Sequence, residues 1–208
     1  MKIRQIPIKN LQVIQRLDLI AQDFLKLPHH WKNSPLPDIS IAKLRELQAD
    51  ENFNGFPTRS NNKDWVNRYD LNHNFRERME ALVGSFNMLA GTSNFYWDSV
   101  VFQPPETGWT PWHNSKLKPR HFVKFIYNSG KGKTHAVQGD KRFKLEDQHN
   151  PTTTKDWTCI VGTMEGDLWV ADRNYGTKPR IILDMSIPTI YHGEFAIVEE
   201  FISSVQVG

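Results

Sequence analysis

The chain has a single cysteine among its 208 residues, and it has no internal repeat. One thiol, Cys159, excludes an internal disulfide and a zinc site built from cysteines, and its apolar neighbours predict that it is buried. No apolar run is long enough to span a bilayer, and the N-terminus has no apolar signal core. These absences predict a soluble protein of the cytoplasm or of a virus particle, without a membrane partner.

Two common enzyme motifs are also missing. Gly130-Lys131-Gly132-Lys133-Thr134 resembles the end of a phosphate-binding loop, but Tyr127 stands where such a loop needs its first glycine. The segment is therefore interpreted as a hairpin turn, and no Gly-Xaa-Ser-Xaa-Gly nucleophile motif occurs. The net charge of +3 is too small for the footprint of a nucleic-acid-binding protein, so no specific nucleic-acid partner is expected.

What the chain does contain, in its first ninety residues, is helical periodicity. Apolar residues recur at spacings of three and four over residues 10–27, 40–48 and 72–89, which predicts three helices. The expected caps are Asn10 for the first helix, Asp38 or Ser40 for the second, and Gly91 at the end of the third.

From Phe95 onward the apolar period changes from about 3.6 to 2. The predicted strands are residues 95–102, 122–127, 157–161, 168–171, 180–187 and 195–198. Short strands with long, irregular connections favour a sandwich or a jelly-roll barrel over a parallel sheet. We therefore expect a mainly β fold, with a helical and loop part at residues 1–92 packed on a β domain at residues 93–208.

Two short motifs bracket the strands. The first is Trp112-His113-Asn114-Ser115 with the following Arg120–Phe125, and the second is Gly166–Trp169 with Asn174 and Arg180–Asp184. Over about residues 95–190 the chain resembles the 2-oxoglutarate/Fe(II)-dependent dioxygenase superfamily, in particular its aspartyl/asparaginyl β-hydroxylase-like and prolyl hydroxylase-like branches. The resemblance implies a double-stranded β-helix of the jelly-roll, cupin-like kind. It also implies His113 as an iron ligand and Arg180, with Trp112 beside the site, as the anchor of 2-oxoglutarate.

The chain departs from the family's pattern at two of the three metal ligands. Ser115 stands in the place of the carboxylate, and Val170 stands where the second histidine belongs, ten residues before Arg180. Asp172, two residues further along the same strand, is a weak substitute ligand. The metal site is therefore expected to be degenerate, with no cofactor; Fe(II) and 2-oxoglutarate are expected only if the chain is an active enzyme.

Each candidate residue also has a purely structural interpretation. His113 can be a hydrogen-bonded core histidine, and Arg180 can form a salt bridge with Asp184 or Asp172. Trp112, like Trp109 and Trp169, can line a pocket or pack in a core. Tyr191 and His192 are expected at the surface or in an interface.

Three functions follow from these observations. The first is a non-catalytic structural or interaction protein that keeps the oxygenase fold and assembles with protein partners or with itself; similarity to oxygenase-like reading frames of bacteriophages makes a virion component the concrete expectation. The second is an active Fe(II)/2-oxoglutarate-dependent hydroxylase that uses His113, Asp172 and Arg180 on a protein or small molecule. The third is a cupin-like module that binds an anion or a sugar beside Arg180.

Overall fold

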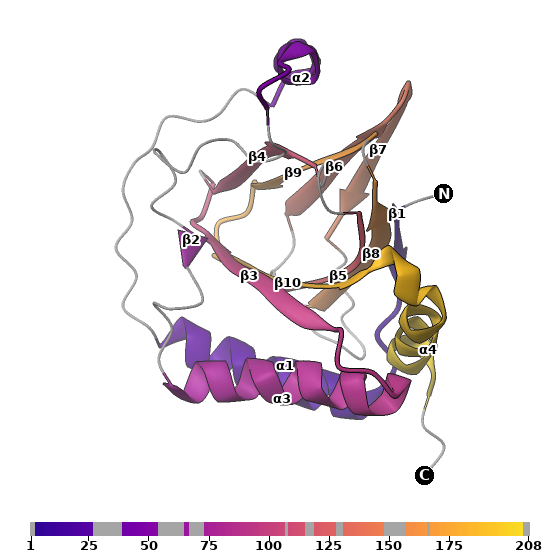
Figure 1. Ribbon diagram of the computed structural model, residues 1–208. Coiled ribbons are helices and arrows are strands. Elements are labelled where there is room, and N and C mark those ends of the chain that lie inside the picture. The colour runs from indigo at the N-terminus through magenta and orange to yellow at the C-terminus, as the bar shows by residue number, and fades with distance from the viewer. Residues whose placement is uncertain are drawn as a thin grey trace.

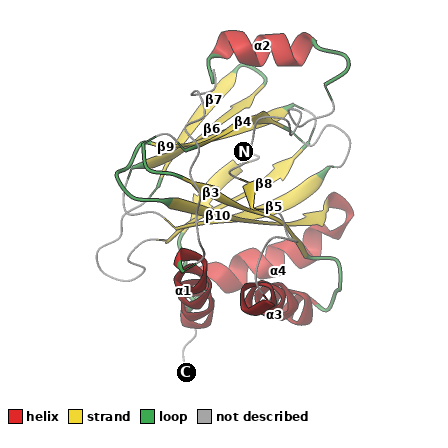
Figure 2. Ribbon diagram, turned by 90° about the vertical axis from the view of Figure 1, so that its left-hand side faces the viewer, coloured by secondary structure: helices red, strands yellow, loops and turns green. Residues whose placement is uncertain are grey.

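The fold consists of two antiparallel sheets that face each other, with helices on the outer surfaces (Figures 1 and 2). The structure, a computed structural model, describes residues 3–26, 39–53, 65–66, 73–106, 108–114, 119–127, 131–147, 157–165 and 167–205. The strands are β1 Ile3–Ile6, β2 Trp65–Val66, β3 Tyr96–Gln103, β4 Trp109–His113, β5 Arg120–Tyr127, β6 Gly132–Gln138, β7 Lys141–Glu146, β8 Trp157–Met164, β9 Leu168–Asn174 and β10 Arg180–Pro188. The helices are α1 Leu11–Leu25, α2 Ile41–Ala49, α3 His73–Ala90 and α4 His192–Ser203, and a short 3₁₀ turn, Thr189–Tyr191, precedes α4.

The strand order identifies a double-stranded β-helix. The large sheet has the order β1-β8-β5-β10-β3-β2 and the small sheet has the order β4-β9-β6-β7. Apart from β6 and β7, which are consecutive in the small sheet, the eight strands from β3 to β10 alternate between the sheets, and this is the jelly-roll topology. This order confirms the predicted fold class. β1 and β2 come from the part predicted to hold helices and loops only, and they extend the two edges of the large sheet.

Helices α1, α3 and α4 cover the outer face of the large sheet, whereas α2 lies on the small sheet (Figure 2). Alternate residues of β10, namely Ile181, Leu183, Met185 and Ile187, join the apolar cluster that α1, α3 and α4 also form. Ile182 belongs instead to the cluster between the two sheets, so even-numbered side chains of β10 point into the barrel. Across the described residues, every helix is too short or too polar to traverse a bilayer.

The three predicted helices are confirmed, with their caps. Asn10 Oδ1 accepts hydrogen bonds from the backbone N–H groups of Gln12 and Val13, at 3.0 and 3.3 Å. Ser40 Oγ accepts one from the N–H of Lys43 at 3.2 Å. Gly91 ends α3 with φ +64°, a backbone conformation that costs a side-chain-bearing residue energy.

Two strand-level predictions are wrong. Residues 195–198, predicted as a strand, lie inside α4, where Phe195, Val198 and Ile202 form one buried helical face. A four-residue apolar run fits either period, and packing against α3 and the sheet decides for the helix. The segment interpreted as a hairpin turn at residues 130–134 contains the start of β6; the turn between β6 and β7 is at Gly139, with φ +55°, and Asp140. The sequence analysis did not predict β1, β2, β4, β6 and β7.

Candidate functional site

The candidate residues come together inside the barrel, on three different strands. His113 ends β4, Asp172 lies in the middle of β9, and Arg180 begins β10. In the pairing of β4 with β9, the residue opposite His113 is Val170. The position expected for a second metal-binding histidine therefore does lie beside His113, and an isopropyl group fills it. Ser115 lies outside the described residues.

Asp172 is buried and is held by positive charge. Its Oδ2 atom lies 3.0 Å from Lys124 Nζ, and its Oδ1 atom accepts a hydrogen bond from the Thr134 hydroxyl and lies 3.5 Å from Arg180 Nη1. Burial alone would raise the pKa of Asp172, but Lys124 and Arg180 together hold it well below its ordinary value. Asp172 is therefore an ionised carboxylate whose two oxygens are both engaged by the protein.

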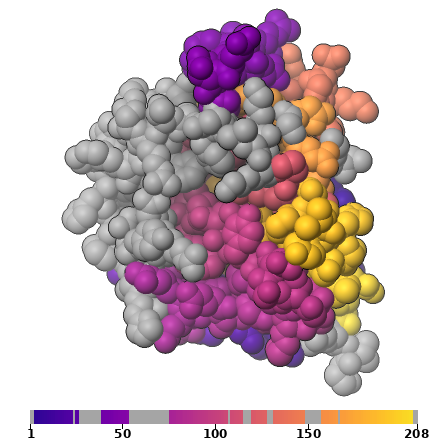
Figure 3. Space-filling view, in the orientation of Figure 1, coloured from indigo at the N-terminus to yellow at the C-terminus, as the bar shows by residue number. Residues whose placement is uncertain are grey.

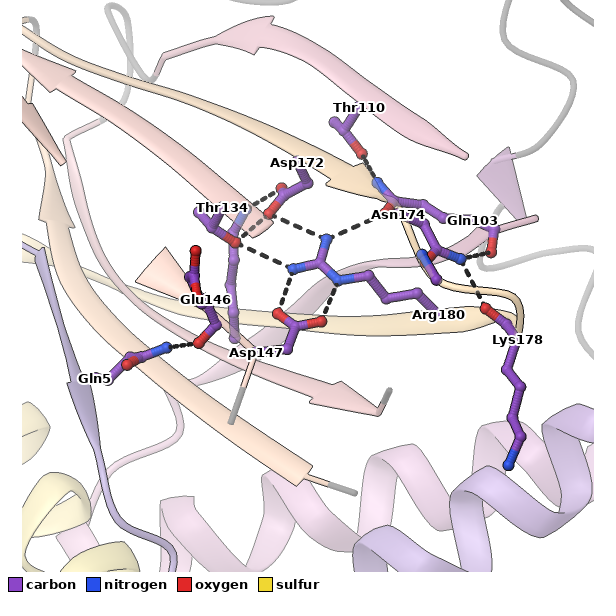
Figure 4. A network of polar contacts seen from close by, with 12 residues as sticks. Gln5, Gln103, Thr110, Thr134, Glu146, Asp147, Asp172, Asn174, Lys178 and Arg180 are labelled. Atoms are coloured by element: carbon purple, nitrogen blue, oxygen red, sulfur yellow. Dashed lines mark hydrogen bonds and ion pairs between the residues drawn. The ribbon is translucent and has the colours of Figure 1, made fainter. Parts of the chain in front are cut away.

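Arg180 is fully buried and its charged end is surrounded by acceptors (Figure 4). Its Nε and Nη2 atoms donate to the two carboxylate oxygens of Asp147, at 2.8 and 2.9 Å, and Nη1 donates to Gln103 Oε1 at 3.0 Å. Burial lowers the pKa of Arg180, but the carboxylates of Asp147 and Asp172 raise it above its ordinary value. The two-pronged pairing with Asp147 is the geometry in which arginine binds carboxylates most strongly.

The structure distinguishes the two salt bridges predicted for Arg180. The salt bridge between Arg180 and Asp172 is present, whereas no ion pair joins Arg180 to Asp184 within the described chain. The main partner of Arg180 is Asp147, which follows β7. No sequence pattern predicts this pair, because the two residues are brought together only by the folding of the barrel. Lys124 did give a sequence signal: it interrupts an otherwise apolar strand.

His113 is a buried, neutral imidazole. Its Nδ1 atom lies 2.9 Å from the carbonyl oxygen of Pro111, so Nδ1 carries the proton and donates it to that carbonyl. Burial, and then the positive charge of Lys124, lowers the pKa of His113 from 6.5 to about 3. The imidazole is therefore neutral mainly because it is buried, and the Lys124 ammonium adds a smaller effect that also disfavours a metal cation.

A second group of charges lies along the same inner face. Arg120 Nη1 lies 3.0 Å from Asp98 Oδ2, and Ser186 Oγ donates to the same oxygen at 2.6 Å. Burial raises the pKa of Asp98 to about 6, although Arg120 acts in the opposite direction. Burial also raises the pKa of Asp184, and its Oδ1 atom is buried without a hydrogen-bond partner among the described residues. Among its described residues, the barrel interior therefore holds three cations and four carboxyl groups beside the apolar cluster between the sheets.

The residues present do not fit a mononuclear Fe(II) centre. Such a centre takes two histidines and one carboxylate on one face. The interior offers one imidazole, a valine and a carboxylate already paired with Lys124 and Arg180. Among the described residues, no group of three or more His, Cys, Asp or Glu side chains is placed to hold a metal ion. Arg180 does not fit the role of a 2-oxoglutarate anchor either, because its Nε and Nη2 groups already donate to the carboxylate of Asp147.

Trp112 and Trp169 pack as core residues on the outer face of the small sheet. Trp112 and Trp169 are buried in a cluster with Leu44 of α2, and Phe53 stacks on Trp169 with ring centroids 5.2 Å apart. Trp112 therefore points away from the barrel interior and does not line the site. Tyr191 packs against the helical cluster, and His192 is exposed beside His121.

No protein-family model matches the sequence, and no curated protein is similar to it. Solved structures with a related strand arrangement include a predicted oxalate decarboxylase from Thermotoga maritima, with 17% identity over 45% of this chain and 64% of that chain and a TM-score of 0.29. A prolyl-4-hydroxylase from Pseudomonas putida has 13% identity, covers 90% of this chain and 92% of its own, and gives a TM-score of 0.42. A prolyl hydroxylase from Trichoplax adhaerens, in complex with a hypoxia inducible factor peptide, has 10% identity over 94% and 86% of the two chains and a TM-score of 0.44. The present chain thus spans less than two thirds of the first of these proteins, and at such identities the similarity concerns the cupin and oxygenase-like fold alone.

Proposed function

We propose that the chain is a non-catalytic structural or interaction protein built on a double-stranded β-helix. One observation carries the proposal: the side chains that would bind metal and cosubstrate are already bound to each other. Asp172 is paired with Lys124 and Arg180, and Arg180 with Asp147. These contacts connect β5, β9, β10 and the residue after β7, so the charged side chains link the two sheets.

Electrostatics explains why this arrangement opposes oxygenase chemistry. A divalent cation that used Asp172 would lie beside the Lys124 ammonium, and like charges at such short range repel strongly when both are buried. A dicarboxylate that used Arg180 would have to displace Asp147, which is covalently part of the chain and so competes at high effective concentration. Both ligands therefore compete against intramolecular partners.

Metal and cosubstrate titrations test the non-catalytic half of the proposal. An active hydroxylase should gain about 2.7 kcal/mol in its free energy of unfolding at a ligand concentration of 100 times Kd. We expect no stabilisation of the anaerobic protein by Fe(II) or Mn(II), with or without 2-oxoglutarate, and no iron by elemental analysis of protein produced in iron-supplemented medium. Stoichiometric iron together with a 2-oxoglutarate-dependent rise in Tm, both lost in His113→Ala, would establish the alternative, an Fe(II)/2-oxoglutarate hydroxylase.

Exposed apolar side chains on the helical side support the interaction half of the proposal. Met88 and Ile190 are each 82% exposed, and Leu11 is 66% exposed. Large side chains of this kind lose unfavourable contact with water when a partner covers them. An assembly with protein partners or with itself, such as a bacteriophage particle, is therefore the setting proposed for the chain.

Sedimentation measurements over a range of protein concentrations test that setting. We expect self-association, or co-sedimentation with a partner recovered from the native source, and we expect Met88→Lys together with Ile190→Lys to weaken it. A chain that stays monomeric at all concentrations and recovers no partner would contradict the assembly role while leaving the metal result unaffected.

A further inference from the structure

The outer face of the small sheet carries a dense group of cations. Cross-strand pairing places Lys133 of β6 between Arg173 of β9 and Glu146 of β7, and it places His135 opposite Lys144. Directly opposite side chains on one face of a sheet lie about 4.5–5.5 Å apart at Cβ, so these cations are close neighbours. Lys133, His135, Lys144 and Arg173, together with Tyr175, are called the cationic cluster below.

Tyr175 holds the cationic cluster together. Its ring centroid lies 4.5 Å from Arg173 Cζ and 5.6 Å from Lys133 Nζ, and its hydroxyl oxygen lies 3.5 Å from His135 Nε2. These contacts restrict the side chains of Arg173, Lys133 and His135 to one region of the sheet surface. Each cation–π contact at an exposed site contributes only about 0.5–1 kcal/mol.

The cationic cluster is poorly neutralised. Its one carboxylate neighbour in the pairing is Glu146, which is 64% exposed and lies 3.0 Å from Lys133 Nζ and 3.8 Å from Lys144 Nζ. The adjacent Lys133 ammonium lowers the pKa of Lys144. Burial lowers the pKa of His135; the Asp172 carboxylate acts in the opposite direction, and the charges of Lys144, Lys133 and Arg173 lower it further. Like charges opposite one another destabilise a sheet, so this arrangement costs stability in the free protein.

A second observation shows an unused donor in the same place. The Nε atom of Arg173 is buried and has no hydrogen-bond partner within the part of the chain that the structure describes. A buried N–H group without an acceptor is unfavourable, and a bound anion would satisfy it. The remainder of this face is apolar and lies beneath α2, whereas the side chains of the β6–β7 region stand at the surface beside α2 in Figure 3.

We infer that the cationic cluster is a binding site for a phosphate group. Two ammonium groups and a guanidinium from three adjacent strands provide charge-assisted donors for several oxygens of one anion, and the His135 imidazole and the Tyr175 phenol add neutral donors beside them. Arg142, exposed on the same outward row of β7 as Lys144, continues the positive surface along the strand. The phosphate group can belong to a small molecule or to the backbone of a single-stranded nucleic acid, and both supply the same chemistry. This site lies on the opposite face of the small sheet from Asp172 and is independent of the proposed function.

The test compares three ligands on the full chain at constant ionic strength. The ligands are inorganic phosphate, a short fluorescein-labelled oligothymidylate, and polyglutamate as a polyanion without phosphate. The Lys133→Gln/Lys144→Gln variant removes two charges from the cationic cluster, and Lys9→Gln/Lys26→Gln removes two exposed charges elsewhere. Glu146→Gln removes the competing carboxylate. Tm without ligand checks the folding of each variant.

We expect binding to be at least about tenfold weaker in Lys133→Gln/Lys144→Gln, because two charge-assisted contacts are lost, and stronger in Glu146→Gln. Oligothymidylate binding should also lose about 1.4 from the slope of log K against log salt, since each contact to a single strand contributes about 0.7. Binding of phosphate identifies a small-molecule source, and binding of the oligonucleotide alone identifies a polymer. The inference is overturned if neither ligand binds, if polyglutamate binds equally tightly, or if the Lys9→Gln/Lys26→Gln variant loses as much affinity.

Discussion

Arg180 is the residue on which the interior of the barrel depends. It is fully buried, and its guanidinium touches side chains from β3, β6 and β9 as well as Asp147. A buried ion pair is rarely a large net source of stability, because both charges must be removed from water. Breaking such a pair is nevertheless costly, because the partner is left as an uncompensated charge.

Arg180→Met should therefore lower the free energy of unfolding by about 3–5 kcal/mol, because it leaves Asp147 buried and unpaired. Urea denaturation followed by circular dichroism measures the loss. Arg45→Met, on the exposed side of α2, is the matched control and should change stability by no more than about 0.5 kcal/mol. Adding Asp147→Leu to Arg180→Met should recover part of the loss; if the single variant loses under about 1 kcal/mol, the ion pair is not the link described here.

His113 predicts how stability depends on pH. Its pKa is 6.5 ordinarily and about 3 in the folded chain, so the unfolded state takes up the proton first as the pH falls. The free energy of unfolding should therefore decrease between about pH 6.5 and pH 3, by up to about 5 kcal/mol from this group at about 1.4 kcal/mol per unit. Asp98 acts in the opposite direction between about pH 4 and pH 6, because its raised pKa makes the folded state bind the proton first.

Two variants separate these contributions in urea titrations at a series of pH values. His113→Asn should flatten the loss of stability on acidification, because the amide has no proton to take up. Asp98→Asn should make the loss steeper, because the opposing protonation is removed. If His113→Asn is as acid-sensitive as the original chain, the imidazole is not buried in its neutral form.

At the scale of the element, local sequence decides where helices begin and end, and packing decides the rest. Asn10 and Gly91 were identified from residue type alone, because capping needs only a side-chain acceptor or a positive φ within one turn. Ser40 was one of two candidates; the other, Asp38, lies outside the described residues. The segment at residues 195–198 could not be assigned in this way. Its apolar residues satisfy both periods, and the buried face of α4 exists only when α3 and the sheet are present.

Gly84 inside α3 and Gly91 directly after it make a matched pair of substitutions. Gly91→Ala should destabilise the chain by about 1 kcal/mol, because alanine is strained at φ +64°, whereas Gly84→Ala inside the helix should stabilise it by a similar amount. A Cβ atom at either position meets nothing within 4 Å, so backbone conformation is the only difference. Thermal denaturation measures both, and equal signs for the two changes would contradict the left-handed C-cap.

At the scale of the whole molecule, the helical part and the barrel share one core. The largest apolar cluster combines residues of α1 and α3 with outward-facing residues of β5, β8 and β10. Removal of residues 1–92 would expose that face of the large sheet to water. The predicted boundary at residue 93 therefore separates two segments of the sequence that share one apolar core, and it does not imply that either segment folds alone.

The fragment of residues 93–208 should accordingly show no cooperative thermal transition and should bind a hydrophobic dye, because Phe125, Leu183 and their neighbours lose their cover. The full chain should unfold in one transition with coincident near- and far-ultraviolet circular dichroism. A cooperative transition of the fragment near the Tm of the full chain would show that the barrel folds alone.

The sequence by itself determined α1, α2, α3 and most of the strands of the large sheet, because these depend on periodicity and capping along the chain. The double-stranded β-helix and the gap at Val170 followed from the resemblance to the dioxygenase superfamily. The sequence also identified His113, Asp172 and Arg180 as candidate site residues. Only the tertiary structure decided what they do. Asp147 comes from a segment that no local pattern connects to Arg180, and Lys124 reaches Asp172 from the other sheet. Which charges neutralise one another depends on distances of about 3 Å between strands remote in sequence, where electrostatic energy changes most steeply.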